Sequence, residues 1–175
     1  MTAPMRTTGS LKSTAALAQF MVAHPAHWLA QGFGSGLSPV MPGTTGTLMG
    51  WALFAIPTAL WPTMFTPLFW GVAILVGFMI GIWACDRTGR DMGIADHGSM
   101  VWDEIIAFWV VLVFLMPANF ATQCAAFLWF RFFDMVKPPP IRFFDKHVKG
   151  GFGVMWDDIV AAFYTLLLFA LWRAA

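Results

Sequence analysis

Long apolar runs separated by short polar stretches make up most of the chain. Five runs are continuous rather than alternating in polarity, which predicts helices rather than strands. The runs are Leu48 to Leu60, Phe65 to Ala84, Ile105 to Met116, Ala118 to Phe133 and Ile159 to Trp172. A span needs about 20 residues, and only the second run reaches that length unaided. The first run is short and contains Pro57, so it either crosses a membrane or re-enters from one side.

The composition agrees with a membrane protein. Hydrophobic residues make up 59% of the 175 residues and charged residues 11%, with ten Trp and eighteen Phe. This is too apolar for an ordinary soluble domain, and the continuous runs favour helices over a closed barrel. We therefore expect an all-α, polytopic membrane helical bundle with four to five apolar helices. The net charge of +1 gives no indication of nucleic-acid binding, and Cys85 and Cys124 form neither a disulfide framework nor a zinc cluster.

The turns between the apolar runs predict how the helices are connected. The stretches 61–64 and 117–118 are short and uncharged, so we expect them to join the first two and the next two helices into hairpins. The leader, a Gly-rich loop, and residues 85–100 and 134–152 then lie on one side. That side carries all nine acids and nine of the ten Lys and Arg residues, with Arg173 alone opposite. By the positive-inside rule this face, with its loops, is cytoplasmic.

The first part of the chain is less apolar. We expect residues 1–30 to form a leader that is poorly ordered or lies on the membrane surface, and residues 31–175 to form one membrane-embedded domain. The segment Gly32 to Thr47 reads GFGSGLSPVMPGTTGT, and its glycines and prolines predict a loop rather than a regular helix. Its backbone N–H groups could hold an anion, and Thr44, Thr45 and Thr47 could cap the next helix. A simple linker fits this segment equally well.

A short acidic motif occurs twice. Trp102-Asp103-Glu104-Ile105-Ile106-Ala107 returns as Trp156-Asp157-Asp158-Ile159-Val160-Ala161, each time where an apolar run opens. If the helices begin at Gly98 and Gly153, both acid pairs lie about 7 Å inside them. Carboxylates at such depth are costly and indicate a function or a paired charge. An internal repeat would bring the two pairs face to face, and clustered carboxylates suit Mg²⁺ or Mn²⁺.

Other polar residues add candidate chemistry. Five basic residues in or beside the loop before the second motif could hold a phosphate, although they could equally neutralise the acids; they are Arg131, Lys137, Arg142, Lys146 and Lys149. His97 adjoins Asp96 and is a candidate acid or base, while His24 and His27 are expected at the membrane interface beside Trp28. Acids, bases and a Gly-rich loop at a lipid surface indicate metal-assisted chemistry on a lipid phosphate. The alternative is a small ion-coupled transporter that uses the acid pairs.

Three blocks of the sequence carry a family resemblance. They are GFGSGLSPVMPGTTGTL (Gly32–Leu48), RDMGIADHGSMVWDEI (Arg90–Ile105) and RFFDMVKPPPIRFFDKHVKGGFGVMWDDIVA (Arg131–Ala161). Together and in this order they resemble the bacterial phosphatidylglycerophosphatase A family. The resemblance implies a Mg²⁺-dependent enzyme of the bacterial inner membrane. Such an enzyme hydrolyses the terminal phosphate of phosphatidylglycerophosphate to give phosphatidylglycerol and inorganic phosphate.

The resemblance leads to residue assignments, which we state as hypotheses. The expected metal ligands are Asp103, Glu104, Asp134, Asp157 and Asp158. The expected phosphate-binding groups are Arg131, Lys137 and Arg142, with Thr44, Thr45 and Thr47 supplying backbone N–H groups. The expected catalytic residues are Asp96, His97, Asp103, Asp134 and Asp158, with a carboxylate or His97 activating a water molecule. A covalent aspartyl-phosphate route and a broader lipid-phosphate phosphatase stay open as alternatives.

Overall fold

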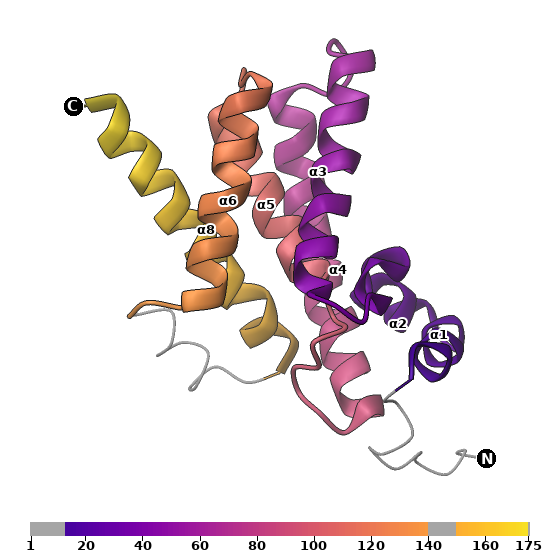
Figure 1. Cartoon of the computed structure of the whole chain (residues 1–175). Coiled ribbons are helices and arrows are strands. Elements are labelled where there is room, and N and C mark those ends of the chain that lie inside the picture. The colour runs from indigo at the N-terminus through magenta and orange to yellow at the C-terminus, as the bar shows by residue number, and fades with distance from the viewer. Residues whose placement is uncertain (1–12, 140–149, 175) are drawn as a thin grey trace.

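The computed structural model describes residues 13–139 and 150–174 of the chain. In these residues every regular element is a helix, which confirms the all-α fold class (Figure 1). The elements are α1 (Thr14–Val22), α2 (Pro25–Ala30), the short 3₁₀ helix η2 (Gly32–Leu37), α3 (Pro42–Leu60), α4 (Pro67–Met92), α5 (Trp102–Leu115), α6 (Phe120–Val136) and α8 (Gly150–Ala174).

Several helix ends are marked by residues suited to them. The Thr66 hydroxyl accepts a hydrogen bond from the Phe69 N–H at the start of α4, and Asn119 caps α6 through the Thr122 N–H. These side chains satisfy backbone donors that have no partner within the first turn. Gly93 ends α4 with a φ of 71°, a left-handed conformation that glycine adopts without strain.

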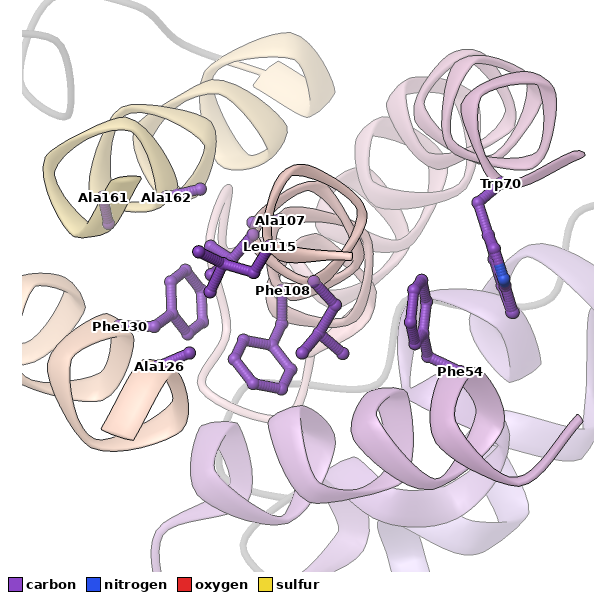
Figure 2. Close-up of a cluster of buried hydrophobic side chains, with 11 residues drawn as sticks. Phe54, Trp70, Ala107, Phe108, Leu115, Ala126, Phe130, Ala161 and Ala162 are labelled. Atoms are coloured by element: carbon purple, nitrogen blue, oxygen red, sulfur yellow. The ribbon is translucent and has the colours of Figure 1, made fainter. Parts of the chain in front are cut away.

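The central helix of the bundle is α5, which packs against α3, α4, α6 and α8. Figure 2 shows its Phe108 directed toward α3, and Phe130 of α6 close to α8. On α8 the small residues Ala161 and Ala162 belong to the same buried cluster, so α8 can approach α6 and α5 closely. The buried face of α5 is almost wholly apolar, and its close packing against four neighbours helps to hold the five long helices together.

Glycines allow α3 to lie directly on α5. A Cβ atom at Gly46 would come within 2.6 Å of the Val101 Cβ, and one at Gly50 within 3.0 Å of the Ile105 Cα. Any larger side chain would separate the two helices, because interiors leave no room for an added methyl group at such distances. This contact fixes the start of α5 against the start of α3.

The hairpin connections are as the sequence predicts. Residues 61–66 join α3 to α4 and residues 116–119 join α5 to α6, both at one end of the bundle (Figure 1). The opposite end gathers η2, the connection from α4 to α5 and the start of α8. The predicted convergence of the polar segments at one end is thus confirmed for the described residues.

Two helix starts differ from the sequence-based expectation. The third apolar helix, α5, begins at Trp102 rather than Gly98, so Asp103 and Glu104 lie in its first turn rather than about 7 Å inside it. In contrast, α8 begins at Gly150 rather than Gly153, which places Asp158 about two turns inside that helix. The two acid pairs therefore occupy different positions in their helices.

The Gly-rich segment is also more regular than predicted. Pro42 begins α3, and the last residues of the segment, up to Thr47, form its first turns. The expected loop is therefore wrong from Pro42 onward, because tight packing of glycines on α5 outweighs their low helix propensity. Within η2 the backbone is irregular, as the predicted loop requires, because Phe33 and Gly34 have left-handed φ values of 56° and 99°.

Part of the predicted leader belongs to the folded domain. Helix α2 packs against α4, and its Ala26 and Ala30 are fully buried. The Ala30 carbonyl also accepts a hydrogen bond of 2.8 Å from the Val101 N–H, next to the start of α5. The folded domain therefore begins before residue 31, and the N-terminal helices support the region that holds the acids.

Two of the described helices, α4 and α8, are long and apolar enough to cross a membrane. The expected number of four to five spanning helices is not confirmed, since α5 has 14 residues and α6 has 17. The outer face of α4 is strongly apolar and exposed, with Leu68 at 79%, Leu75 at 65% and Met79 at 61%. A continuous exposed apolar face of this kind indicates a lipid or protein partner.

Candidate active site

Three carboxylates from two helices meet inside the bundle. Asp103 and Glu104 come from the first turn of α5, and Asp158 comes from α8. One oxygen of each lies within 4.8 Å of the others. Asp103 is 7% exposed and Asp158 only 3%, so the group is shielded from water and its negative charges repel one another strongly. Three of the four acids in the repeated motif therefore lie together, as predicted. The fourth, Asp157, is not in this group.

Helix α6 adds an arginine and a fourth carboxylate. Arg131 pairs with Asp134 three residues along the same helix, and its Nη1 lies 3.7 Å from Glu104 Oε1. The same nitrogen donates a 3.4 Å hydrogen bond to the Thr47 hydroxyl of α3. Asp134 is also near enough to Asp158 for their carboxyl groups to influence each other. Three helices, α5, α6 and α8, therefore supply one set of neighbouring charges, which we call the carboxylate cluster: Asp103, Glu104, Asp134 and Asp158, with Arg131 among them.

Several buried polar atoms of this region have no hydrogen-bond partner. They include Asp103 Oδ1, Glu104 Oε2, Asp158 Oδ2, Arg131 Nε and Thr44 Oγ1. Leaving a buried polar atom unpaired costs about 1–3 kcal/mol, and more for a charged group. One unpaired oxygen from each of three acids is the donor set that a hard divalent cation takes, since Mg²⁺ prefers oxygen ligands. The residues present thus fit a divalent cation at Asp103, Glu104 and Asp158.

Asp157 occupies a different place from the other predicted metal ligands. Its carboxylate pairs with the Lys137 ammonium group, and it is not one of the three clustered acids. Lys137 ends α6 with a φ of 42° and a ψ of 64°. This left-handed conformation is unfavourable for a residue with a side chain, and strained backbone of this kind is often found at functional sites. Lys137 is thereby held at the edge of the cluster.

The predicted acid–base pair lies on the connection from α4 to α5. Asp96 is close enough to Asp103 for their charges to interact, so it belongs to the surroundings of the cluster. The His97 ring contacts a residue of the same connection. Its Nδ1 accepts a 3.2 Å hydrogen bond from the Ser99 N–H and lies 2.8 Å from the Ser99 hydroxyl. In the described part of the chain, no hydrogen bond or ion pair joins His97 to the carboxylate cluster.

The threonines of the Gly-rich segment lie within α3 rather than capping it, because Met41 is the residue that precedes the helix. The Thr45 hydroxyl donates to the carbonyls of Ser35 and Pro42, and the Thr47 hydroxyl donates to that of Gly43.

The N–H groups of Thr44 and Thr45 both donate to the Met41 carbonyl. The predicted anion cradle of backbone N–H groups is therefore wrong for these two residues. Arg142, predicted to bind phosphate, lies outside the described residues.

Gly43 is a site residue that the sequence reasoning missed. A Cβ atom there would meet Glu104 Oε1 and would lie 2.9 Å from the Arg131 Nη2. Only a glycine leaves room for the ion pair so close to the α3 backbone. The sequence contains the string Pro-Gly-Thr-Thr-Gly, but this string does not indicate which side chains of other helices pack against Gly43.

His27 corrects a second expectation. Rather than lying at the membrane interface, it is 4% exposed. Its Nε2 lies 2.9 Å from Asp91 Oδ2 and its Nδ1 lies 3.0 Å from the Phe20 carbonyl. Asp91 is 64 residues away along the chain, so no local sequence pattern points to this partner. The contact fastens α2 to the end of α4.

Comparison with known proteins shows that the chain is a phosphatase, a hydrolase of phosphoric monoesters. The sequence profile of the phosphatidylglycerophosphatase A family matches residues 28–173. The chain belongs to the phosphatidylglycerophosphatase A family. This confirms the resemblance and the prediction of an enzyme, against the transporter alternative.

Individual relatives support this family assignment. The chain is 44% identical over 146 residues to the phosphatidylglycerophosphatase A of Escherichia coli (strain K12), covering 83% of this chain and 82% of the relative. It is 41% identical over 152 residues to the Haemophilus influenzae protein of the same name, covering 87% and 91%. A third relative, from Bacteroides thetaiotaomicron, is 39% identical over 150 residues, covering 83% and 91%, and is named as a candidate phosphatidylinositol-3-phosphatase. No solved structure matches the chain.

Proposed function

We propose that the chain hydrolyses the terminal phosphate of phosphatidylglycerophosphate, with a divalent cation, at the cytoplasmic face of the bacterial inner membrane. The observation that carries this proposal is the buried group of Asp103, Glu104 and Asp158, each with an unpaired oxygen. The proposed substrate rests on the Escherichia coli and Haemophilus influenzae relatives, which are named phosphatidylglycerophosphatase A.

Mg²⁺ is the cation we propose, and Asp103, Glu104 and Asp158 are the residues that would hold it. Bound there, it would supply positive charge that stabilises the phosphoryl group during transfer. The choice of Mg²⁺ over softer metals rests on the donor set, since carboxylate oxygens suit Mg²⁺ and Mn²⁺. Cys85, the one described cysteine that is fully buried, is not part of this set.

The cationic side chains would bind the phosphomonoester. Arg131 has a buried Nε with no partner, and its planar guanidinium suits two oxygens of one phosphate. Lys137, at the end of α6, would add a second positive charge from the edge of the cluster. The Thr44 hydroxyl, also buried and unpaired, would donate to a phosphate oxygen. This replaces the backbone cradle expected from the sequence.

A carboxylate of the site would take the proton of the attacking water molecule. The water oxygen forms a bond to phosphorus while the bond from phosphorus to the terminal glycerol oxygen breaks, and that oxygen takes up a proton as phosphatidylglycerol leaves. Asp134 and Asp96 are the candidates for proton transfer, because both adjoin the three clustered acids without belonging to them. We keep His97 as a weaker candidate, since its Nδ1 is bonded to Ser99.

The site lies where a lipid headgroup could reach it. The apolar, exposed faces of α4 and α8 would contact the acyl chains, with Phe163 at 62% and Leu171 at 60% exposure on α8. The carboxylate cluster lies toward the opposite end of α8 from Arg173. We therefore propose a multi-pass arrangement in which α4 and α8, which pack on each other, span the bilayer and the shorter helices pack beside them.

Phosphate release by the detergent-purified protein tests the proposal. Phosphatidylglycerophosphate and phosphatidic acid are offered separately, each with Mg²⁺ and with an excess of chelator. Release from the first lipid alone, abolished by chelator, is the expected result. Absence of release from a folded, Mg²⁺-loaded protein would contradict the proposed reaction.

A broader lipid-phosphate phosphatase is the second candidate. The Bacteroides thetaiotaomicron relative favours it, because that protein is named for a different phosphorylated lipid. Comparable release from phosphatidylglycerophosphate and phosphatidic acid in the same assay would establish this broader activity.

A further inference from the structure

An apolar groove runs along α8 where this helix lies beside α5. The groove has a volume of about 390 Å³, and every described residue that lines it is apolar. Val110 and Phe114 form its α5 side, and Ile159, Phe163 and Ala170 lie along its α8 side. Figure 1 shows the C-terminal half of α8 inclined away from the other helices. Because ligand pockets measure about 300–1,000 Å³, a groove of this size takes one slender apolar ligand.

The groove lies between the same two helices that supply the three clustered acids. Asp103 belongs to α5, and Asp158 of α8 immediately precedes Ile159 of the groove. On α5, Asp103, Val110 and Phe114 follow one another at spacings of seven and four residues, so they lie on one face of the helix. Val110 is about 10 Å beyond Asp103 along the helix axis. That interval is available to the polar part of a lipid whose terminal phosphate lies at the acids.

The length of the groove matches one leaflet of a bilayer. From Ile159 to Ala170, α8 rises by about 16 Å, and half of the hydrocarbon core is about 15 Å thick. Helix α8 is one of the two described helices that are long and apolar enough to cross a membrane. The groove residues follow Asp158 in this helix, toward Arg173. An acyl chain of a lipid in the leaflet next to the active site therefore has the length and the polarity to fill the groove.

A second apolar groove, on the opposite side of α8, lies farther from the acids. It measures about 290 Å³ and lies between α6 and α8, with Ala125 and Trp129 on α6 and Leu168 on α8 among its lining residues. None of its described lining residues on α8 is nearer to Asp158 than Leu168, which is about 15 Å away along the helix. The α6–α8 groove therefore lacks the connection to the active site and provides an internal comparison.

We propose that the groove between α5 and α8 holds one acyl chain of the substrate lipid while the terminal phosphate lies at Asp103, Glu104 and Asp158. The inference deepens the proposed function and rests on it, because it concerns the lipid on which the chain would act. An acyl chain gains nothing from the hydrophobic effect when it leaves other lipids for an apolar helix surface, so close packing is what favours the groove. The bound chain holds the lipid in one orientation, with its headgroup directed to the acids.

Filling the far end of the groove tests this placement. Ala170 is exposed, so Ala170→Phe should leave the fold intact while it occupies the place where a long chain ends. We expect the KM for dipalmitoyl phosphatidylglycerophosphate in mixed micelles to rise about 3- to 10-fold at unchanged kcat, because several weak carbon–carbon contacts are lost together. The dioctanoyl lipid, whose chains have half as many carbons, should keep its KM.

Ala125→Phe is the matched control, because it places the same ring in the α6–α8 groove. It should change the KM of neither lipid, and circular dichroism confirms that both variants are folded. An Ala170→Phe enzyme with unchanged KM values, equal effects on both lipids, or the same dependence on chain length in Ala125→Phe would overturn the proposal.

Photolabelling of the wild-type protein identifies the occupant and needs no turnover. The probe is a phosphonate analogue of phosphatidylglycerophosphate, which cannot be hydrolysed, with a diazirine at the end of one acyl chain. We expect mass spectrometry to find the label at Phe114 and Ala170, displaced by an excess of unlabelled phosphatidylglycerophosphate but not by phosphatidylcholine. Equal displacement by both lipids would mean that any bilayer lipid occupies the groove. A disulfide-linked dimer formed by Phe163→Cys in a Cys124→Ala background, without label, would mean that a second copy of the chain covers it. Either result would overturn the proposal.

The outcomes also separate this inference from the proposed function. Displaceable label in the groove of a protein that releases no phosphate would refute the proposed reaction and leave the acyl-chain site in place. Phosphate release together with label only at Trp129, in the α6–α8 groove, would refute the acyl-chain site and leave the reaction in place.

Discussion

Replacing Gly43 by alanine tests whether the first turn of α3 shapes the ion pair of the active site. The new Cβ atom would meet Glu104 Oε1 and would lie 2.9 Å from the Arg131 Nη2, about 0.5 Å closer than the 3.4 Å at which ordinary contact begins. Both partners are the far ends of flexible side chains. They can therefore move away, and the substitution changes the site more than the fold.

The expected magnitudes follow from this displacement. Alanine in a helix interior is favoured over glycine by roughly 0.5–1 kcal/mol, and moderate overpacking costs about 1–3 kcal/mol. The free energy of unfolding should therefore fall by no more than about 2.5 kcal/mol. A catalytic group misplaced by about 1 Å costs on the order of 10²-fold in rate. We expect kcat to fall by about 10- to 100-fold.

The assay is phosphate release by membranes and by purified protein, together with a thermal unfolding curve. Gly71→Ala is the matched control, because Gly71 also lies within a helix and a Cβ atom there meets nothing within 4 Å. It should retain full activity. A Gly43→Ala enzyme with wild-type kcat would refute the placement of Glu104 and Arg131 against α3, and equal losses in both variants would point to a general effect of glycine replacement.

Three further predictions follow from the same geometry. Asp158→Asn should lower kcat by at least about 10²–10³-fold in a protein that still folds, and near-normal turnover would remove Asp158 from the site. Lys137→Ala should raise KM more than it lowers kcat, because it binds ground and transition states alike; the reverse split would mean that Lys137 acts in the chemical step. In a Cys124→Ala background, a cysteine at Ala95 should react with an impermeant reagent only from the cytoplasm and one at Met64 only from outside, and the opposite pattern would invert the topology.

The sequence predicted the parts of the fold that depend on local pattern. Continuous apolar runs correctly indicated helices, and short uncharged turns correctly indicated two hairpins. The repeated acid motif correctly brought Asp103 and Glu104 toward Asp158. Each of these features follows from periodicity or from the cost of burying a charge, both of which can be read from one chain.

The errors concern features that depend on distant partners. Gly43 lies in a helix because that helix fits against α5, which propensity alone does not reveal. Asp157 pairs with Lys137 because α6 ends in a left-handed turn there. His27 is buried beside Asp91 of another helix, whose carboxylate forms a hydrogen bond with the His27 ring. In each case the deciding contact is between segments that the sequence pattern leaves independent.

The position of the metal is the central claim, and anomalous diffraction tests it most directly. Crystals of the protein grown with Mn²⁺ are measured at the manganese absorption edge, so that the difference map shows only the metal. We predict density bounded by the carboxylates of Asp103, Glu104 and Asp158. A fully occupied Mn²⁺ ion elsewhere, with none at these three carboxylates, would contradict the proposed active site.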